Sequence, residues 1–344
     1  MMRTKFTLFT ILALLMIGVL PNFAQGLDYT VLVDGLNNPR GLNFDENGVL
    51  YVAEAGLGGD IEIEGPFGPA MYGNTARVSA VVDGEVSVVI DYLPSMNMGG
   101  EMVGAMDVLA TADSLWVVMG HEMKGVTLAG TVVSYNRISL RPQMIFDPFG
   151  YEHRYDPDGT GELLSNPTSV ALAPDGLSAL IVDASGNTLY RASYDGALDV
   201  VKAWEGNPVP TAVDYNEDGS QYAVSFLTGF PFLNGAARIE VYDSATDELV
   251  MTYEGLTLLT DVMFDDGGAL LAVVYGEFNP QAGGWQANSG GVVAVTPDGV
   301  VPVVMGLNFP YSIAKNPVDG SYAVSVNAVS AEGEGAIITF SAPN

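Results

Sequence analysis

The stretch Asn38–Gly56 reads NPRGLNFDENGVLYVAEAG, and a looser copy, NPTSVALAPDGLSALIVDASG, occupies Asn166–Gly186. Both contain a turn residue, a variable residue, a small or acidic residue and an aliphatic residue, followed by a polar turn and an apolar run. Six segments fit this template, beginning 43 to 66 residues apart: Pro39–Leu42, Ala105–Val108, Pro167–Val170, Pro210–Val213, Leu259–Val262 and Pro310–Ile313. Repeats of this length are typical of chains that build one small β-unit per repeat.

Each repeat is expected to supply four strands, of which the template provides the first two. Further runs of β-branched and aromatic residues between turn residues predict third strands at 76–82, 131–135, 188–193, 237–242, 291–296 and 336–341. Fourth strands are predicted at 85–90, 143–146, 198–204, 248–253 and 300–305. The sixth repeat lacks a fourth strand, and residues 27–36 carry a matching strand before the first repeat. No convincing amphipathic helix is predicted in the mature chain.

This arrangement predicts an all-β fold, a six-bladed β-propeller with four-stranded blades in which the N-terminal strand closes the last blade. Radial closure would leave no long sheet edge exposed to aggregation. Small residues at the third template position, such as Gly41 and Ala212, suit strands that crowd around a central channel. A β-sandwich or a β-helix is the competing architecture, and the strand shared between the termini disfavours both.

The N-terminal residues predict a secretory signal peptide at 1–24, followed by a single propeller domain at 25–344. Arg3 and Lys5 precede an apolar run, residues 6–20, and Ala24 supplies a small residue before the expected cleavage site. An uncleaved membrane anchor is the alternative. The chain contains no cysteine, so no disulfide can stabilise it. We expect a protein that is secreted or located in the periplasm.

The formal net charge is −29, from 12 basic and 41 acidic residues. A surface this acidic repels nucleic acid and anionic membranes, so neither is an expected partner. We expect a monomer whose partner is a small molecule, a glycan or a protein, with no membrane insertion after the signal is removed.

Ligands are expected on the face that carries the loop into each first strand and the loop between second and third strands. Long loops rich in Gly, Pro and aromatic residues fall there, at 55–75, 149–165, 227–236 and 276–290. Their aromatic side chains could instead only pack the loops down. The candidate ligand-binding residues around the channel are Arg40, Glu54, Asp107, His121, Asp183, Asp261, Tyr311 and Asn327.

Nucleophilic catalysis has little support, because the chain has two histidines, no cysteine and no G-x-S-x-G elbow. Carboxylates are better candidates. Glu54, Asp183 and Asn327 each end a second strand, and together they could bind Ca²⁺ or another divalent cation. The competing interpretation is that they are polar turn residues in contact with water. The segment 156–164, DPDGTGELL, lacks EF-hand spacing and is expected to be a turn-rich linker.

One repeat, PRGLNFDENGVLYVAE, resembles an NHL repeat, and the arrangement is similar to gluconolactonase-like six-bladed propellers. Nearly all of the mature chain resembles the ScyD/ScyE family through residues 35–59, 155–176, 189–196 and the stretch TGFPFLNGAARIEVY at 228–242. That resemblance implies an exported propeller without an assigned reaction. The chain departs from the family at 104–107, where Gly-Ala-Met-Asp replaces Gly-Pro-His-Asp. Phe226 and Tyr275 also stand where acidic residues are expected, so a site that used these positions in relatives is in doubt here.

The leading functional hypothesis is an exported propeller that serves as a binding or scaffold module, with its ligand face formed by the long loops. The alternative is a divalent-metal-dependent hydrolase of the lactonase kind, because gluconolactonase-like enzymes use a comparable Glu/Asn/Asp arrangement. Convergence of Glu54, Asp183 and Asn327 on one cation would favour the hydrolase. The sequence leaves open whether the protein is an enzyme.

Overall fold

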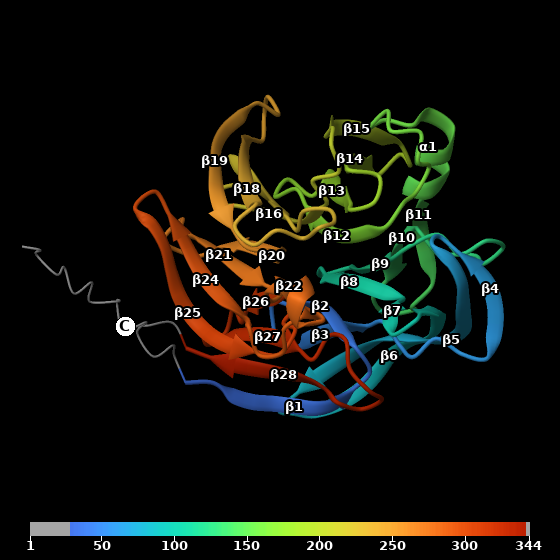
Figure 1. Ribbon diagram of the computed structural model, residues 1–344, viewed down its shortest axis with the longest axis horizontal. Coiled ribbons are helices and arrows are strands. Elements are labelled where there is room, and N and C mark those ends of the chain that lie inside the picture. The colour runs from blue at the N-terminus through green and yellow to red at the C-terminus, as the bar shows by residue number, and fades with distance from the viewer. Residues whose placement is uncertain (1–27, 342–344) are drawn as a thin grey trace, which may run out of the picture.

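The computed structural model describes residues 28–341, which form a nearly all-β protein of antiparallel sheets grouped around a common centre (Figure 1). The expected signal peptide lies outside the described residues. Within residues 28–341, no helix is long and apolar enough to cross a membrane.

Six sheets of the described chain contain the same succession of four antiparallel strands. In the order of their first strands, they are β2 (Pro39–Phe44), β3 (Leu50–Glu54), β5 (Gly68–Val82) and β6 (Glu85–Met98); β8 (Ala105–Ala110), β9 (Ser114–Met119), β10 (Val132–Asn136) and β11 (Pro142–Phe146); β12 (Pro167–Leu172), β13 (Ser178–Asp183), β14 (Thr188–Ser193) and β15 (Leu198–Ala203); β16 (Pro210–Tyr215), β17 (Gln221–Phe226), β18 (Ala237–Asp243) and β19 (Leu249–Leu256); β20 (Leu259–Phe264), β21 (Leu270–Val274), β24 (Gly290–Thr296) and β25 (Gly299–Leu307); and β26 (Ile313–Lys315), β27 (Tyr322–Val326), β28 (Gly335–Phe340) and β1 (Thr30–Leu36). The first sheet also includes β4 (Ile61–Gly65) and β7 (Glu101–Val103).

The hydrophobic core lies between the faces of neighbouring sheets. Nearly every residue of the second strand in each sheet is buried, as in β3, β9 and β21. These strands are therefore covered on both faces, which explains their continuous apolar sequences, such as LYVAE and LWVVM. One cluster joins Ile181 of β13 to Trp116 of β9, and the next joins Leu180 of β13 to Tyr222 of β17.

The first strands of the six sheets, β2, β8, β12, β16, β20 and β26, contact one another in that order, and β26 contacts β2. At each place where two neighbouring sheets meet around this ring, a hydrogen bond joins the backbone of one sheet to a side chain of the other. In order these bonds run from Ala110 N–H to Asn43 Oδ1 (3.1 Å), Val170 N–H to Asp107 Oδ2 (3.0 Å), Val213 N–H to Ser169 Oγ (3.3 Å), Phe264 N–H to Asp214 Oδ2 (2.8 Å), Ile313 N–H to Asp261 Oδ2 (2.9 Å) and Ser325 Oγ to Arg40 O (2.7 Å).

The two ends of the described chain meet in one sheet. The N-terminal strand β1 pairs antiparallel with β28, with Val31 opposite Ile338 and Leu36 opposite Gly335. Figure 1 shows these strands side by side. The pairing predicted between residues 27–36 and the last strand is therefore present, and it covers the edge that β28 would otherwise expose.

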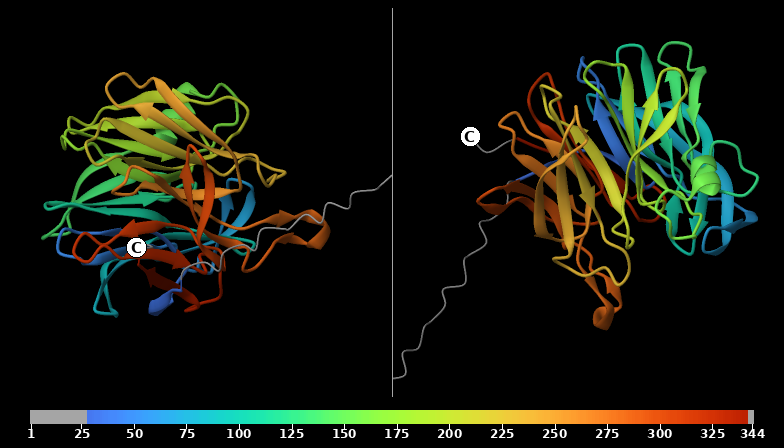
Figure 2. Two further views of the ribbon diagram at one scale, coloured as in Figure 1. Left: turned by 90° about the vertical axis from the view of Figure 1, so that its left-hand side faces the viewer. Right: turned by 90° about the horizontal axis from the view of Figure 1, so that it is seen from above.

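Three segments expected to be loops contain regular structure, two of them strands and the third, 149–165, most of the helix α1 (Pro148–Tyr155). The segment 55–75 forms β4 and the start of a long β5, and 276–290 forms an arm of β22 (Phe278–Asn279), η1 (Pro280–Ala282) and β23 (Gly284–Trp285). This arm projects from the body of the sheets (Figure 2).

One short α-helix is present, and it is not amphipathic, so it does not contradict the prediction of no convincing amphipathic helix. The segment after β11 forms α1 (Pro148–Tyr155), where the Asp147 side chain accepts a hydrogen bond from Gly150 N–H and Pro148 occupies the first turn. Only Pro148 and Glu152 of this helix are buried, so an eight-residue helix leaves almost no apolar periodicity to detect.

Candidate functional site

The six template segments form the six first strands, which contact one another in a ring. The place of a residue within its template segment therefore sets how deep that residue lies along the central channel. Second-position residues line a cavity at the end where these strands begin, which we call the entry cavity. Third-position residues lie at mid-channel. Third- to sixth-position residues line a smaller cavity at the opposite end, which we call the exit cavity.

The entry cavity has a volume of about 620 Å³. Its floor is made by the six second-position residues Arg40, Met106, Thr168, Thr211, Thr260 and Tyr311. Within this chain the third position stays small or acidic and the fourth stays aliphatic, while the second carries a cation, a thioether, three hydroxyls and a phenol. The repeated positions build the ring, and the variable position faces the cavity.

Aromatic side chains from the long loops form the walls of the entry cavity. Phe232 and Trp285 pack with their ring centroids 5.3 Å apart, and Trp285 meets Tyr275 edge-on at 5.0 Å. On another side, Phe67 lies edge-on to His121 at 5.5 Å and is 70% exposed. These four aromatic residues come from the expected loops at 55–75, 227–236 and 276–290 and from the end of β21, so they surround the cavity from several sheets.

Arg40 is the one arginine or lysine in the lining of the entry cavity. It is 2% exposed, and its Nη2 donates to Glu101 Oε1 at 2.9 Å and to Met102 O at 2.7 Å. Its guanidinium carbon lies 4.8 Å from the centre of the Tyr311 ring. Burial raises the pKa of Tyr311 and of Tyr275, so both phenols stay protonated near neutral pH.

Three buried polar atoms of the entry cavity have no hydrogen-bond partner in residues 28–341. They are Arg40 Nε, His121 Nδ1 and Thr260 Oγ1. Most buried polar atoms in folded proteins do have a partner, and an unpaired one costs about 1–3 kcal/mol. The side chains that carry these atoms line one cavity, but the atoms themselves are shielded from solvent, so a bound molecule would reach them only after those side chains shift toward it.

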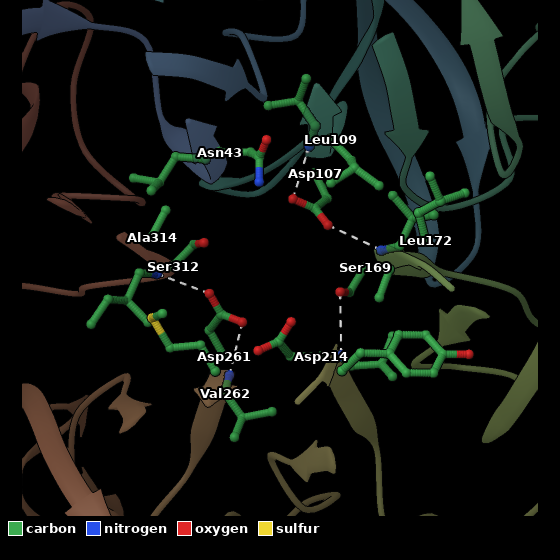
Figure 3. Close-up of a pocket in the computed structure, with 18 of the residues that line it drawn as sticks. Asn43, Asp107, Leu109, Ser169, Leu172, Asp214, Asp261, Val262, Ser312 and Ala314 are labelled. Carbon is green, nitrogen blue, oxygen red and sulfur yellow. Dashed lines mark hydrogen bonds between the residues drawn. The ribbon is translucent and has the colours of Figure 1, made fainter. Parts of the chain in front are cut away.

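The exit cavity has a volume of about 300 Å³ and contains three carboxylates, those of Asp107, Asp214 and Asp261 (Figure 3). Each accepts a backbone hydrogen bond at a junction between sheets, so these residues have a clear structural role. Burial raises the pKa of Asp107 to about 8, that of Asp214 to about 7 and that of Asp261 to about 6, and for Asp107 the charge of Asp261 adds to the rise.

The structure distributes the candidate residues over separate places. Arg40, His121 and Tyr311 lie together in the entry cavity, whereas Asp107 and Asp261 line the exit cavity. Glu54, Asp183 and Asn327 line neither cavity.

The proposed metal ligands are occupied by neighbours of their own sheets. Both oxygens of Glu54 accept hydrogen bonds, from Arg77 at 2.7 and 2.8 Å, from Ser79 Oγ and from Asn37 N–H. Both oxygens of Asp183 accept as well, from Ser165 Oγ, Asn166 N–H and Gly186 N–H. Asn327 bonds to Asn308 and Glu334. These three networks share no partner, so the geometry gives the expected cluster no support.

The sequence-based candidates omitted most of the entry cavity floor. Thr168, Thr211 and Thr260 were not singled out, because threonine within a β-rich run is read first as a strand former. The signal that could have found them was present in the sequence, since they occupy the variable column of the repeat.

No protein-family model matches this chain, and no curated protein matches its sequence. Solved structures do match its shape. A gluconolactonase from Xanthomonas campestris aligns over 92% of this chain and 89% of its own length, with a TM-score of 0.59 and 13% identity. A protein of unknown function from Bacteroides thetaiotaomicron aligns over 92% of this chain and 72% of its own, with a TM-score of 0.54 and 15% identity. Virginiamycin B lyase from Staphylococcus aureus covers 92% and 89%, with a TM-score of 0.50 and 12% identity. At such identities the likeness concerns the fold, which is that of propeller-like, NHL-like proteins.

Proposed function

We propose that this protein binds a small molecule in the entry cavity and acts as a binding module. The observation that carries the proposal is the set of unpartnered atoms Arg40 Nε, His121 Nδ1 and Thr260 Oγ1 around one cavity. The variable column of an otherwise uniform repeat lines the same cavity, as expected when one position of a scaffold is specialised for a ligand.

The lining defines the chemistry of the proposed ligand. Arg40 Nε can only donate a hydrogen bond, and the Thr260 hydroxyl can donate as well, whereas the hydroxyls of Thr168 and Thr211 already donate to backbone carbonyls. The ligand therefore needs oxygen acceptors at the channel end. Tyr275, Trp285 and Phe232 offer a wall against which a ring or other flat apolar body would pack. A ring compound with a carboxylate or several hydroxyl groups satisfies both requirements.

The alternative, a metal-dependent hydrolase of the lactonase kind, has less support. The fold likeness to a gluconolactonase carries no information on activity at 13% identity. The oxygens of Glu54 and Asp183 that such a metal would need already accept hydrogen bonds from Arg77, Ser165 and backbone groups.

Binding is tested by calorimetry with three classes of probe, namely aromatic carboxylates, phenolic glycosides and simple sugars. We expect saturable binding of at least one class. Arg40→Gln removes a charged hydrogen-bond donor and should weaken binding by about 10- to 100-fold. Thr260→Val removes a neutral donor and should weaken binding by about 3- to 10-fold. Thr252→Val, on the outer strand β19, is the matched control and should bind like the parent. Affinities that do not change in Arg40→Gln and Thr260→Val would contradict this site.

We also propose that the six sheets are the blades of a six-bladed propeller, exported as a monomer and related to the ScyD/ScyE family. The repeat, the cyclic contacts of the first strands and the pairing of β1 with β28 support the blade count. Nucleic acid and membranes are not proposed partners, given the charge of −29. Export is checked by the intact mass of secreted protein, which should begin near Gln25; a mass that retains Met1 would indicate an anchor.

A further inference from the structure

A group of three acidic side chains follows α1, away from both cavities of the channel. Glu152 lies within the helix, and Asp156 and Asp158 lie in the loop that leads to β12. One carboxylate oxygen from each of the three lies within 4.8 Å of the others. This is the only such group of three or more Asp, Glu or His residues in residues 28–341.

Glu152 has no compensating interaction in the described structure. The residue is fully buried at 0% exposure, and neither Oε1 nor Oε2 has a hydrogen-bond partner. The charged groups that act on it most strongly are Asp158, Asp183, Asp156 and Glu122, all of them carboxylates. An ionised carboxylate in such a position is expensive unless a cation neutralises it.

The other two carboxylates are oriented by the loop and still have room for a cation. Asp158 Oδ1 accepts from Thr160 N–H at 3.0 Å and from Thr160 Oγ1 at 2.9 Å, and its Oδ2 accepts from Asn187 Nδ2 at 3.0 Å. Asp156 accepts only the long bonds from Gly161 N–H, at 3.2 and 3.3 Å. A carboxylate oxygen has two lone-pair sites, so these contacts leave acceptor capacity on both Asp156 oxygens and on Asp158 Oδ2.

We propose that Glu152, Asp156 and Asp158 bind a divalent cation, and that calcium is the ion this set fits best. The ligands are all oxygen, and the buried Glu152 can contribute both of its oxygens. Calcium takes six to eight oxygens in flexible geometry, with backbone carbonyls and water completing the shell. Zinc is disfavoured because the group contains no histidine or cysteine.

A cation here would hold the loop that leads into β12. The last two residues of that loop are Ser165 and Asn166. The Ser165 hydroxyl donates a hydrogen bond to Asp183, and Asn166 lines the entry cavity. Asn166 Oδ1 also accepts from His121 N–H at 3.0 Å. The cation would therefore stabilise the wall of the entry cavity without touching the ligand, and the proposal does not depend on what the cavity binds.

The test uses the full chain after removal of metal with a chelator. Calcium chloride should bind with a stoichiometry of about one ion per chain in calorimetry. Calcium should also raise the unfolding temperature beyond sodium chloride at matched ionic strength, because a ligand of the folded state stabilises by mass action while general screening acts in both salts. Equal shifts in the two salts, with no heat of binding, would overturn the proposal.

Two glutamate variants locate the site. Glu152→Gln removes the buried charge, so it should fold without calcium and lose the calcium-dependent shift. Glu162→Gln changes an exposed residue of the same loop and should keep the shift. The competing state is a protonated Glu152, because burial and the neighbouring carboxylates raise the pKa of Glu152 to about 8. A calcium response retained by Glu152→Gln, or lost equally in both variants, would also overturn this assignment.

Discussion

Asp107 illustrates how single residues serve the ring of first strands. Its carboxylate accepts hydrogen bonds from Val108 N–H at 2.8 Å and from Val170 N–H at 3.0 Å, so it joins two sheets. The Asp107 carboxylate can lie between the two sheets only because residue 41, on the neighbouring strand β2, is a glycine. A Cβ atom on Gly41 would lie 2.1 Å from Asp107 Oδ1 and 2.6 Å from its Cα.

Gly41→Ala should therefore destabilise the protein by about 1–3 kcal/mol, the usual cost of overpacking a tight site. The measurement is the free energy of unfolding from denaturant titration. Gly267→Ala is the control, because its new Cβ would have only the flexible Asp265 side chain as a close neighbour, at 3.3 Å. Equal stabilities of Gly41→Ala and the parent protein would show that the strands are less crowded than described.

The exit cavity predicts that stability falls as the pH rises. Asp214 has a pKa raised from 3.8 to about 7, so the unfolded chain releases this proton at lower pH than the folded protein does. Stability from this group is complete below about pH 4 and is lost as the pH rises to about 7. The Asp214 side chain faces a cavity that water can enter, and water weakens the effect of the raised pKa. We therefore expect ionisation of Asp214 to lower the free energy of unfolding by about 1–2 kcal/mol.

Asp214→Asn keeps an acceptor for Phe264 N–H and should flatten the fall in unfolding free energy between acidic and neutral pH. The acidic surface itself also destabilises the fold as carboxylates ionise. Asp298→Asn, which removes one exposed charge from a turn, measures that general effect. Identical pH dependence in the two variants would mean that Asp214 titrates normally.

The sequence indicates candidate residues but not the groups that they contact. The repeat places Arg40, Tyr311 and His121 near the channel, and the structure brings them into one cavity. It also places Glu54 at a strand end, where Arg77 and Ser79, more than twenty positions later, occupy its carboxylate. Which donors reach a side chain is decided by strand pairing, and the periodicity of one strand carries no information on it.

At the scale of elements, strands were easier to predict than α1. The third and fourth strands occur close to their expected places because alternating and apolar runs mark them. In contrast, α1 depends on the Asp147 cap, and its one deeply buried charged residue, Glu152, lies in the group of carboxylates. A helix defined by caps and charges leaves no apolar stripe in the sequence.

The pairing of β1 with β28 leads to a prediction about elements. A chain that begins at Asn38 lacks β1 and leaves the edge of β28 open, so it should lose several kcal/mol, a large part of the stability of an ordinary domain. A chain that begins at Asp28 retains β1 and should unfold like the full chain. Thermal unfolding measures both, and similar midpoints for the two shortened chains would argue against the role given to β1.

At the scale of the whole molecule, no sheet is independent of its neighbours. The second strand of each sheet is buried on both faces, and each junction between neighbouring sheets carries its own hydrogen bond. Loss of one sheet would expose apolar surface on two others. We therefore expect the sheets to unfold together as one cooperative unit.

Pairing between β1 and β28 also constrains how the protein can be made. Ribosomes synthesise β1 long before β28, so β1 must wait for residues 335–340 before it finds its partner. Until then the nascent chain has an incomplete ring with apolar faces open to solvent, and contacts this distant in sequence form slowly. Chaperone binding and protease sensitivity should therefore persist until β28 has been made, and they should end only when β28 pairs with β1.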